Sequence, residues 1–336
     1  MSSKTRITVI PGDGIGPDII KSAIAILDHV GCDFVYDYAL AGLTALEETG
    51  ELLPQNTLDL IQSNKIALKG PLTTPVGKGF TSINVTLRKH FDLYANVRPV
   101  RTFEGTKAHF SGIDILTVRE NTEGMYSGAG QIIDDARTHA EAKSIITRAR
   151  SERVIRFAYE LARREGRKKV TTLHKANIMK TTSGLFLEVA RELAKEYSDI
   201  ESEEMIVDAA CMNLVMYPER FDVVVTTNLF GDIVSDLCAG LVGGLGMAPG
   251  ANIGKDVAIF EAVHGSAPDI AGKNIANPTS VILASVQMLR HLHMDKQADQ
   301  IMHALRETIA AGDRTTYDLG GNSTTDEFTQ SIIQHL

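Results

Sequence analysis

Residues 7–17 read Ile7-Thr-Val-Ile-Pro-Gly-Asp-Gly-Ile-Gly-Pro17, and they decide how the chain begins to fold. The first four residues are β-branched, which is typical of a buried strand, and the proline and glycines that follow favour a loop. Residues 18–30 then have helical spacing and stop at Gly31. A strand that leads into a helix through a glycine loop is a building unit of α/β sheets.

The same alternation continues along the chain. Further strands are expected at 33–38, 66–69, 114–118, 169–173, 223–226 and 258–261, and further helices at 58–63, 148–164, 184–196, 233–239, 280–291 and 296–310. This order predicts an α/β protein with a mostly parallel sheet. Residues 240–254 hold six glycines and one proline and are expected to be irregular. Residues 120–145 are polar with a mixed pattern, and we assign them no element.

Length and charge limit the possible classes. The 336 residues are too many for one typical domain and suit two. With 42 acidic and 34 basic residues the net charge is −8, which argues against general nucleic-acid binding because phosphate neutralisation needs a basic surface. No apolar run reaches the length of a membrane span. We therefore expect no nucleic-acid partner and no membrane partner.

Cysteine use points to a reducing compartment. Cys32, Cys211 and Cys238 are odd in number and form no C-x-x-C pair, which argues against a disulfide framework or a structural zinc site. The first residues lack the long apolar segment and cleavage site of a signal peptide. These features predict a cytoplasmic location.

The glycine loop differs from the common nucleotide-binding loops. Gly12, Gly14 and Gly16 do not match G-x-G-x-x-G, and no Walker A sequence occurs, so a Rossmann domain is not indicated. The simplest interpretation is a tight turn in which glycine permits φ > 0.

Three aspartates are candidates for a metal site. Asp232 and Asp236 lie four residues apart at an expected helix start, so they share a face. Asp208 lies in the apolar stretch Ile206-Val-Asp-Ala-Ala-Cys211, where an unpaired carboxylate would be costly. Three oxygen ligands suit Mg²⁺ or Mn²⁺ better than zinc. The alternative is that Asp232 and Asp236 are surface acids stabilised by the helix dipole.

Three arginines flank apolar segments: Arg88, Arg98 and Arg119. Each by itself is more often a surface or salt-bridge residue, but three that converge would offer forks to a small polycarboxylate. Tyr126 and Lys175 follow expected strands; each alone is more often a packing tyrosine or a surface lysine, and each serves as acid or base only in a site that tunes it.

Seven ordered segments resemble the decarboxylating β-hydroxyacid dehydrogenases, the isocitrate and isopropylmalate dehydrogenase family. They are VIPGDGIGP (9–17), YANVRP (94–99), RENTEG (119–124), HKANIMK (174–180), NLFGDIVSD (228–236), GGLGMAPGANIG (243–254) and EAVHGSAP (261–268). The resemblance runs essentially from end to end.

The resemblance implies an α/β fold that is not a Rossmann fold, with two domains and a central cleft. Residues 1–95 and 243–336 would form the large cofactor-binding domain, and residues 96–242 the small domain, with a dimerisation excursion near 124–148. The active sites would be shared between the subunits of a homodimer or a higher homo-oligomer.

The resemblance also implies roles for the candidate residues. The three arginines would bind the malate-type carboxylates of a small-molecule polycarboxylate substrate, and Tyr126 would be the general acid. Lys175, contributed by the neighbouring subunit, would assist proton transfer at the substrate hydroxyl. Mg²⁺ or Mn²⁺ would be held by Asp232, Asp236 and the partner's Asp208. The chemistry implied is hydride transfer to the nicotinamide, loss of CO₂ and protonation by Tyr126.

The segment before Arg88 bears on the substrate. Ser82 and Asn84 match a serine and an asparagine that isocitrate dehydrogenases carry, where isopropylmalate enzymes have apolar residues. A hydroxyl and an amide can bind the third carboxylate of isocitrate, and a site built for polar partners rejects an apolar group strongly. Homoisocitrate is harder to exclude, because one methylene is worth only about 1–3 kcal/mol.

Asp269 and Ile270 bear on the cofactor. Relatives that use NADP tend to carry Lys and Tyr there, and a carboxylate would accept hydrogen bonds from ribose hydroxyls while repelling a 2′-phosphate. We therefore predict NAD. Other cofactor contacts implied by the resemblance are Leu72, Thr73, Thr74, His264, Gly265 and Asn277.

Three hypotheses remain: an active NAD-dependent isocitrate dehydrogenase, a homoisocitrate or 3-isopropylmalate dehydrogenase, and a non-catalytic regulatory subunit of a hetero-oligomer. Such subunits typically lose catalytic or metal residues, whereas Tyr126, Lys175 and the three aspartates are all present here.

Overall fold

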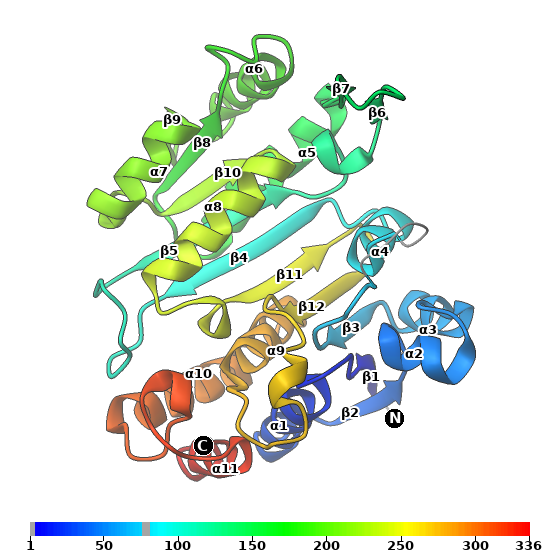
Figure 1. The fold of residues 1–336 in the computed structure, drawn as a ribbon. Coiled ribbons are helices and arrows are strands. Elements are labelled where there is room, and N and C mark those ends of the chain that lie inside the picture. The colour runs from blue at the N-terminus through cyan, green and yellow to red at the C-terminus, as the bar shows by residue number, and fades with distance from the viewer. Residues whose placement is uncertain (1–3, 76–80) are drawn as a thin grey trace.

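The computed structural model describes residues 4–75 and 81–336, and a ten-stranded sheet runs through the middle of this part of the chain (Figure 1). The strand order is β2-β1-β3-β12-β11-β4-β5-β10-β8-β9. The strands are β1 Thr5–Ile10, β2 Phe34–Tyr38, β3 Ile66–Lys69, β4 Ala95–Arg101, β5 Asp114–Glu120, β8 Lys169–His174, β9 Glu201–Ile206, β10 Val223–Thr226, β11 Pro249–Ile253 and β12 Ala258–Ala262. The α/β class is confirmed.

Helices cover the sheet (Figure 1). Helix α9 packs on β11 and β12, whereas α5 packs on β5, β8 and β10. The helices are α1 Gly16–His29, α2 Leu43–Thr49, α3 Gln55–Asn64, α4 Ile83–His90, α5 Arg148–Arg164, α6 Thr182–Ala194, α7 Val207–Met216, α8 Asn228–Leu241, α9 Thr279–His291, α10 Asp295–Ala311 and α11 Thr325–Gln334. No helix among the described residues is long and apolar enough to cross a bilayer.

Helix α5 shows how the sequence specifies such an element. Its apolar residues recur every three or four positions, so they form one buried face that includes Val154, Ala158 and Tyr159. The Thr147 hydroxyl caps its first turn by accepting a hydrogen bond from the Arg150 amide. The helix has the bounds expected from the pattern.

The sheet is mostly parallel, as expected, but its centre is antiparallel. Strand β11 is antiparallel to both β12 and β4, and β4 is antiparallel to β5. The prediction of an irregular segment at 240–254 is wrong at Pro249–Ile253, which forms β11. Gly250 opposes Glu261 in this pairing, and a Cβ at Gly250 would lie 2.9 Å from the Val263 side chain. The glycine here permits a crowded strand pair.

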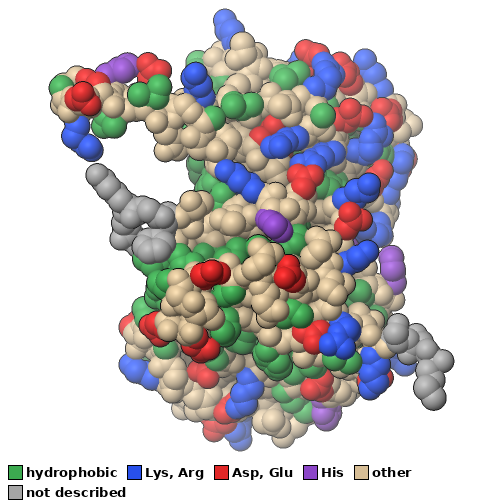
Figure 2. All heavy atoms as spheres, turned by 90° about the vertical axis from the view of Figure 1, so that its right-hand side faces the viewer, with side chains coloured by type: hydrophobic (Ala, Val, Ile, Leu, Met, Phe, Trp, Pro, Cys, Tyr) green, Lys and Arg blue, Asp and Glu red, His purple; other side chains and the backbone are tan. Residues whose placement is uncertain are grey.

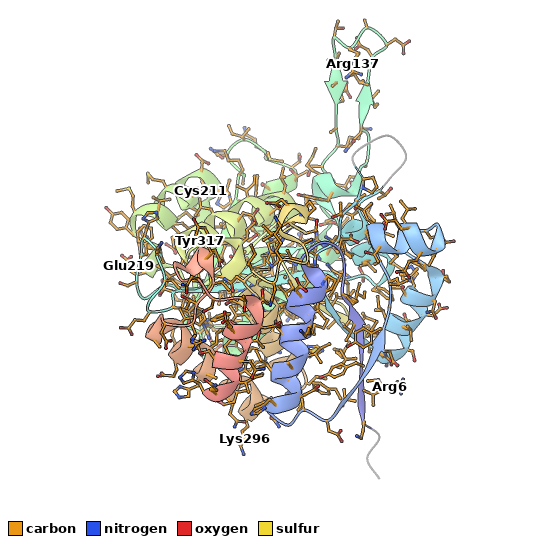
Figure 3. The ribbon with its side chains drawn as sticks, turned by 60° about the horizontal axis from the view of Figure 1, so that its bottom comes forward. Arg6, Arg137, Cys211, Glu219, Lys296 and Tyr317 are labelled. Atoms are coloured by element: carbon orange, nitrogen blue, oxygen red, sulfur yellow. The ribbon has the colours of Figure 1, made fainter. Side chains whose placement is uncertain are left out.

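The unassigned segment 120–145 contains a short hairpin. Strands β6 (Ile132–Ile133) and β7 (Ala140–Glu141) pair in an antiparallel ribbon of their own. Figure 3 shows this hairpin standing clear of the body of the molecule, with Arg137 near its tip. Ile132 and Ile133 are exposed.

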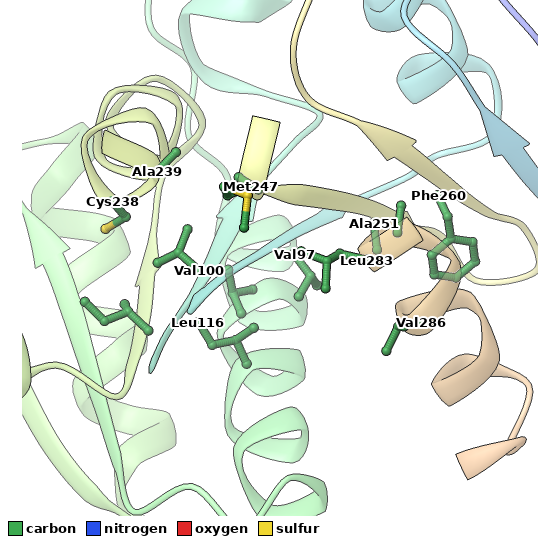
Figure 4. Packing of buried hydrophobic residues seen from close by; sticks show 14 of the residues in the cluster. Val97, Val100, Leu116, Cys238, Ala239, Met247, Ala251, Phe260, Leu283 and Val286 are labelled. Carbon is green, nitrogen blue, oxygen red and sulfur yellow. The ribbon is translucent and has the colours of Figure 1, made fainter. Parts of the chain in front are cut away.

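The main hydrophobic core spans the centre of the sheet. Val97 and Val100 from β4, Leu116 from β5 and Phe260 from β12 belong to one buried cluster (Figure 4). This cluster includes residues from both of the predicted domains, and the division into domains itself stays a prediction. On the surface, the face in Figure 2 mixes acidic and basic side chains.

Candidate active site

Asp13, in the glycine loop, ties three segments together. Its carboxylate accepts hydrogen bonds from the backbone amides of Leu43 (3.0 Å), Thr44 (2.9 Å) and Thr73 (2.7 Å), and from the Thr44 hydroxyl (3.0 Å). Two of these donors are amides of the first turn of α2, which lack partners within the helix. The loop therefore fixes the start of α2 and the segment that follows β3.

Glycine is required in this loop by close contact as well as by conformation. Gly12 and Gly14 have φ of +78° and +60°, and a Cβ at Gly14 would lie 1.9 Å from the Ser266 carbonyl oxygen. The neighbouring Ile15 amide donates to that same carbonyl at 2.9 Å. The interpretation as a tight structural turn is confirmed.

Arg119, at the end of β5, is the most deeply buried of the three candidate arginines, with 1% of its surface exposed. Its Nε and Nη2 atoms donate to Asn228 Oδ1 at 3.0 and 2.8 Å, and its Nη1 donates to Asp232. Its guanidinium also lies over the Tyr126 ring, 5.0 Å from the centroid. Gly231 makes room for it, since a Cβ there would lie 2.5 Å from Arg119 Cγ.

Arg98, on β4, contacts helix α8, which also carries Asp232. Its Nη1 donates to Ser235 Oγ at 2.8 Å and to Asp236 Oδ1 at 2.9 Å, while Nη2 lies 3.8 Å from Asp232 Oδ1. Because Asp232 and Asp236 are one turn apart on α8, Arg98 spans both carboxylates.

Tyr126 completes this group. It lies in a short 3₁₀ turn at Gly124–Ser127, and its hydroxyl donates to Asp232 Oδ2. Burial and the hydrogen bond to Asp232 raise the pKa of the Tyr126 hydroxyl. Burial alone would also raise the pKa of Asp232, but Arg119, Tyr126 and Arg98 outweigh it and hold that pKa below its usual range. The structure thus brings together Arg98, Arg119, Tyr126, Asp232 and Asp236.

Arg88 belongs to a second, buried ionic cluster. Its Nη2 lies 4.0 Å from Glu261 Oε1, and Lys69 Nζ lies 2.8 Å from Glu261 Oε2. Lys69 and Glu261 are paired neighbours on β3 and β12, and both are almost completely buried. Neither residue was predicted from the sequence to belong to the site, although a lone charge in each of two apolar strands is a signal of a buried pair.

Asn84 and Ser82 lie on α4 and just before it. The cavity that Asn84, Arg88, Lys69 and Glu261 help to line is small, about 10 Å³. Within the described residues Asn84 Oδ1 is buried without a hydrogen-bond partner, so this amide has bonding capacity to spare. Ser82 is exposed at the start of α4.

Lys175 and Asp208 lie together and pair with each other, not with the arginines, Tyr126 or the aspartates of α8. Lys175 Nζ donates to Asp208, and this hydrogen bond holds the pKa of Asp208 below its usual range. Asp208 is thus paired rather than alone, and its side chain is 66% exposed in the first turn of α7, so its apolar sequence neighbours do not bury it. Among the residues the structure describes, no three His, Cys, Asp or Glu side chains are grouped to hold a metal.

The predicted cofactor residues follow two neighbouring strands. Strands β3 and β12 are parallel, so the segments after them leave the sheet at the same edge. Thr73 Oγ1 and Ser266 Oγ are 2.6 Å apart and join these two segments. Leu72 packs against a smaller buried apolar cluster, and the Thr74 hydroxyl accepts a 3.4 Å hydrogen bond from the Ile83 amide.

The remaining cofactor candidates lie along the chain after β12. His264 Nδ1 is 3.0 Å from the Gly265 carbonyl oxygen, and burial lowers the pKa of this imidazole. Asn277 Nδ2 donates to Asp318 at 2.8 Å. Asp269 and Ile270 are in a 3₁₀ turn, and Asp269 is exposed. An exposed carboxylate beside a loop is free to accept hydrogen bonds from a ligand.

Comparison with known proteins agrees with this architecture. A family model described as isocitrate/isopropylmalate dehydrogenase matches residues 6–332. A mitochondrial NAD isocitrate dehydrogenase catalytic subunit, subunit 5 of Arabidopsis thaliana, is 50% identical over 100% of this chain and 90% of its own length. The 3-isopropylmalate dehydrogenase of Archaeoglobus fulgidus is also 50% identical, over 98% of this chain and 99% of its own.

A solved structure is similar over nearly the whole chain. The crystal structure of isocitrate dehydrogenase from Methylococcus capsulatus superposes with a TM-score of 0.94 at 54% identity, covering 98% of both chains. The family match and these relatives all span almost every residue, and the protein belongs to the isocitrate/isopropylmalate dehydrogenase family.

Proposed function

We propose that this dehydrogenase is an NAD-dependent isocitrate dehydrogenase, which oxidises and decarboxylates isocitrate to 2-oxoglutarate and CO₂. The observation that carries the proposal is the convergence of Arg98, Arg119 and Tyr126 on Asp232. This group offers two arginine forks for substrate carboxylates beside a hydroxyl suited to proton transfer. The relatives named as isocitrate dehydrogenases support the choice of substrate.

Asn84 supports isocitrate over an acid with an apolar side chain. Its side chain lines a cavity together with Arg88, and its Nδ2 group would donate a hydrogen bond to the third carboxylate of isocitrate. An isopropyl group offers Nδ2 no acceptor, which costs about 1–3 kcal/mol. The second candidate is 3-isopropylmalate, because a relative of that name is as similar to this chain as the isocitrate dehydrogenases are. Homoisocitrate is the third acid to test.

The carboxylates of α8 fit a hard divalent cation. Asp232 and Asp236 offer oxygen donors one turn apart, and Asp208 from a second copy would complete three. When bound, Mg²⁺ or Mn²⁺ at these carboxylates would neutralise negative charge on substrate oxygens, and the nicotinamide would take up the hydride. Asp232 and Asp236 would then exchange part of their contact with the arginines for the cation.

The protein side chains bind the substrate and move its protons. Arg88, Arg98 and Arg119 would bind carboxylates through planar forks in a largely buried setting, where such pairs exclude water and orient the acid. Tyr126 carries its proton at neutral pH, since a tyrosine hydroxyl is ordinarily protonated there and its surroundings raise its pKa further, so it can donate that proton to the carbon that loses CO₂. Lys175 Nζ of the second copy would hold the proton that leaves the substrate hydroxyl.

An exposed apolar surface supports the shared site. Met212, Val215 and Met216 of α7 and Ile233 of α8 are each more than half exposed. Helices α7 and α8 pack against each other, and they also carry Asp208 and Asp232. Apolar patches of this kind mark protein interfaces, and we propose a homodimer or higher homo-oligomer that covers the patch.

The direct test is NADH formation at 340 nm by the purified chain alone, with Mg²⁺ or Mn²⁺. Isocitrate, homoisocitrate and 3-isopropylmalate are compared, each with NAD and with NADP. Turnover of isocitrate with NAD is the expected result. Preference for another acid would overturn the assignment of Ser82 and Asn84, and no turnover with any acid would favour a regulatory subunit.

The shared site is tested by mixing two inactive variants, Asp208→Asn and Asp232→Asn. A mixed dimer would contain one site in which both aspartates are intact. Random mixing of equal amounts should therefore recover about a quarter of the wild-type activity, since half of the dimers are mixed and each has one intact site of two. No recovery after subunit exchange would contradict the shared site.

Cofactor choice is tested by the double substitution Asp269→Lys with Ile270→Tyr. Removing the carboxylate and adding a cation should shift kcat/KM toward NADP. An unchanged preference would overturn the assignment of Asp269.

We also propose a cytoplasmic location on the basis of the cysteine composition, although several relatives are named as mitochondrial.

A further inference from the structure

Two buried asparagines connect Arg98 of the candidate site with the buried ionic cluster of Lys69, Arg88 and Glu261. Asn96 lies on β4 and Asn252 on β11, where the two residues are paired across the antiparallel strands. Their exposed fractions are 0% and 3%, and Glu261 on β12 is 4% exposed. These three residues, called here the asparagine relay, lie on three adjacent strands of the sheet.

The hydrogen bonds of the relay all point in one direction. Arg98 Nε donates to Asn96 Oδ1 at 3.0 Å, and Asn96 Nδ2 donates to Asn252 Oδ1 at 2.9 Å. Asn252 Nδ2 then donates to Glu261 Oε1 at 2.7 Å. Each amide accepts from one neighbour and donates to the next, so the chain of dipoles is oriented toward the carboxylate.

Each end of the relay contacts an arginine that is proposed to bind substrate. At one end is Arg98, which also contacts Asp236 and Ser235. At the other end Glu261 faces the cations of Lys69 and Arg88. Asn252 also accepts a bond from Asn121 Nδ2 at 3.0 Å, which holds its amide plane. Arg88 and Arg98 belong to different predicted domains, and the relay is a direct polar connection between them.

We propose that the asparagine relay positions Arg98 and Arg88 relative to each other, so that both guanidinium groups meet the carboxylates of one substrate molecule. Asn96, Asn252 and Glu261 are positioning residues that act through the arginines. The inference rests on the proposed function insofar as the arginines are taken to bind the acid. It adds that substrate affinity depends on side chains that the substrate does not reach.

The main test is the variant Asn252→Leu, which keeps a similar volume and removes both relay hydrogen bonds at that position. The KM for the acid should rise at least about tenfold, because each lost buried bond loosens the placement of an arginine. The KM for NAD and kcat should change much less. A purely structural role would lower the melting temperature without this separation of the two KM values. Asn64→Leu is the matched control, since Asn64 donates two side-chain hydrogen bonds, to Thr8 and Asp37, away from the relay.

A second variant, Asn96→Asp, protects the test against a folding failure. The new carboxylate keeps a favourable contact with Arg98 but cannot donate to Asn252, so only the onward connection is broken. A raised KM for the acid in this variant supports the relay. An unchanged KM in Asn96→Asp, or in folded Asn252→Leu, overturns it, as does a fall in kcat at constant KM.

The experiment separates this inference from the proposed function. The variants are assayed with whichever of the three acids the wild type prefers, because all three share the malate-type carboxylates. If the wild type oxidises none of them, the proposed function fails, and calorimetric binding of the same acids with Mg²⁺ becomes the readout. Weaker binding to Asn252→Leu than to wild type then still supports the relay, and equal or absent binding overturns it.

Discussion

Glu261 and Asp232 are both carboxylates among cations, yet their surroundings differ. Glu261 is buried, and although burial raises its pKa, Lys69 and Arg88 outweigh this and lower the pKa to about 2. The side chain of Asp232 is 34% exposed, and it accepts hydrogen bonds from Arg119 and Tyr126. A carboxylate paired with a cation is therefore enclosed in the core at Glu261 and partly open to solvent at Asp232.

Removing the buried charge gives the largest expected effect and tests whether the pair is structural. Glu261→Gln leaves Lys69 and Arg88 without their anion, and breaking a buried pair from one side costs about 3–5 kcal/mol of the free energy of unfolding. Denaturant unfolding followed by circular dichroism measures this. Asp326→Asn is the control, because its 3.2 Å pair with Lys21 is exposed. Equal denaturation midpoints for Glu261→Gln and Asp326→Asn would show that the buried pair is no more important for stability than the exposed one.

Acid should reduce the difference between wild type and Glu261→Gln. The folded pKa of Glu261 is lowered to about 2 from an ordinary value of 4.5. A group whose pKa is lowered on folding contributes stability above its unfolded pKa and loses it as the pH falls through the folded value. The stability gap between the two proteins should therefore be constant above about pH 5 and shrink toward pH 2. A constant gap over this range would contradict the ionised buried pair.

Tyr126→Phe tests the catalytic role proposed for the partly exposed site around Asp232. The variant keeps the ring over Arg119 and removes the hydroxyl that donates to Asp232. Loss of a general acid should lower kcat about 100-fold or more, while substrate affinity and the melting temperature change little. Tyr38→Phe is the control, since Tyr38 is 61% exposed at the end of β2. Normal turnover by Tyr126→Phe would show that its assigned role is wrong.

Asp13→Asn examines a third carboxylate, one held by N–H donors and a hydroxyl. An amide in its place presents N–H groups to the amides of Leu43 and Thr73, which costs about 1–3 kcal/mol of the free energy of unfolding. The KM for NAD should rise as well, because the Thr73 segment is a predicted cofactor contact. Asp59→Asn, in which an exposed carboxylate accepts from Gln55 in α3, is the control. An unchanged KM would separate the loop from cofactor binding.

Local patterns predicted most of the elements because they lie on strongly periodic segments. The helix at 148–164 and the strand at 66–69 have the expected bounds. The antiparallel strands β4 and β11 could not be foreseen, since β11 is only five residues long in a glycine-rich stretch and pairs with distant partners. Helix α4 was missed as well, because only Ile83 and Leu87 of its eight residues are buried.

The candidate site likewise has features that the sequence predicted and features that it did not. The spacing of Asp232 and Asp236 correctly placed both on one helix face, where Arg98 reaches them. Asp208 was singled out because its sequence neighbours are apolar, but α7 leaves Met212 and Val215 exposed. An apolar stretch predicts burial against something, and the sequence does not tell whether that surface belongs to the same chain. The roles of the site residues stay predictions that the experiments above test.

The contact between Arg98, Arg119 and the aspartates of α8 has a thermodynamic consequence. The arginines are already desolvated and already paired, so a polycarboxylate that reaches them replaces one set of anions by another. Such an exchange adds little to the number of ion pairs at the arginines, but the aspartates stay attached to α8, so the negative charge of the acid is added to the site. Binding of the acid and binding of a cation should then strengthen each other, because the displaced aspartates become available to a cation in the same event.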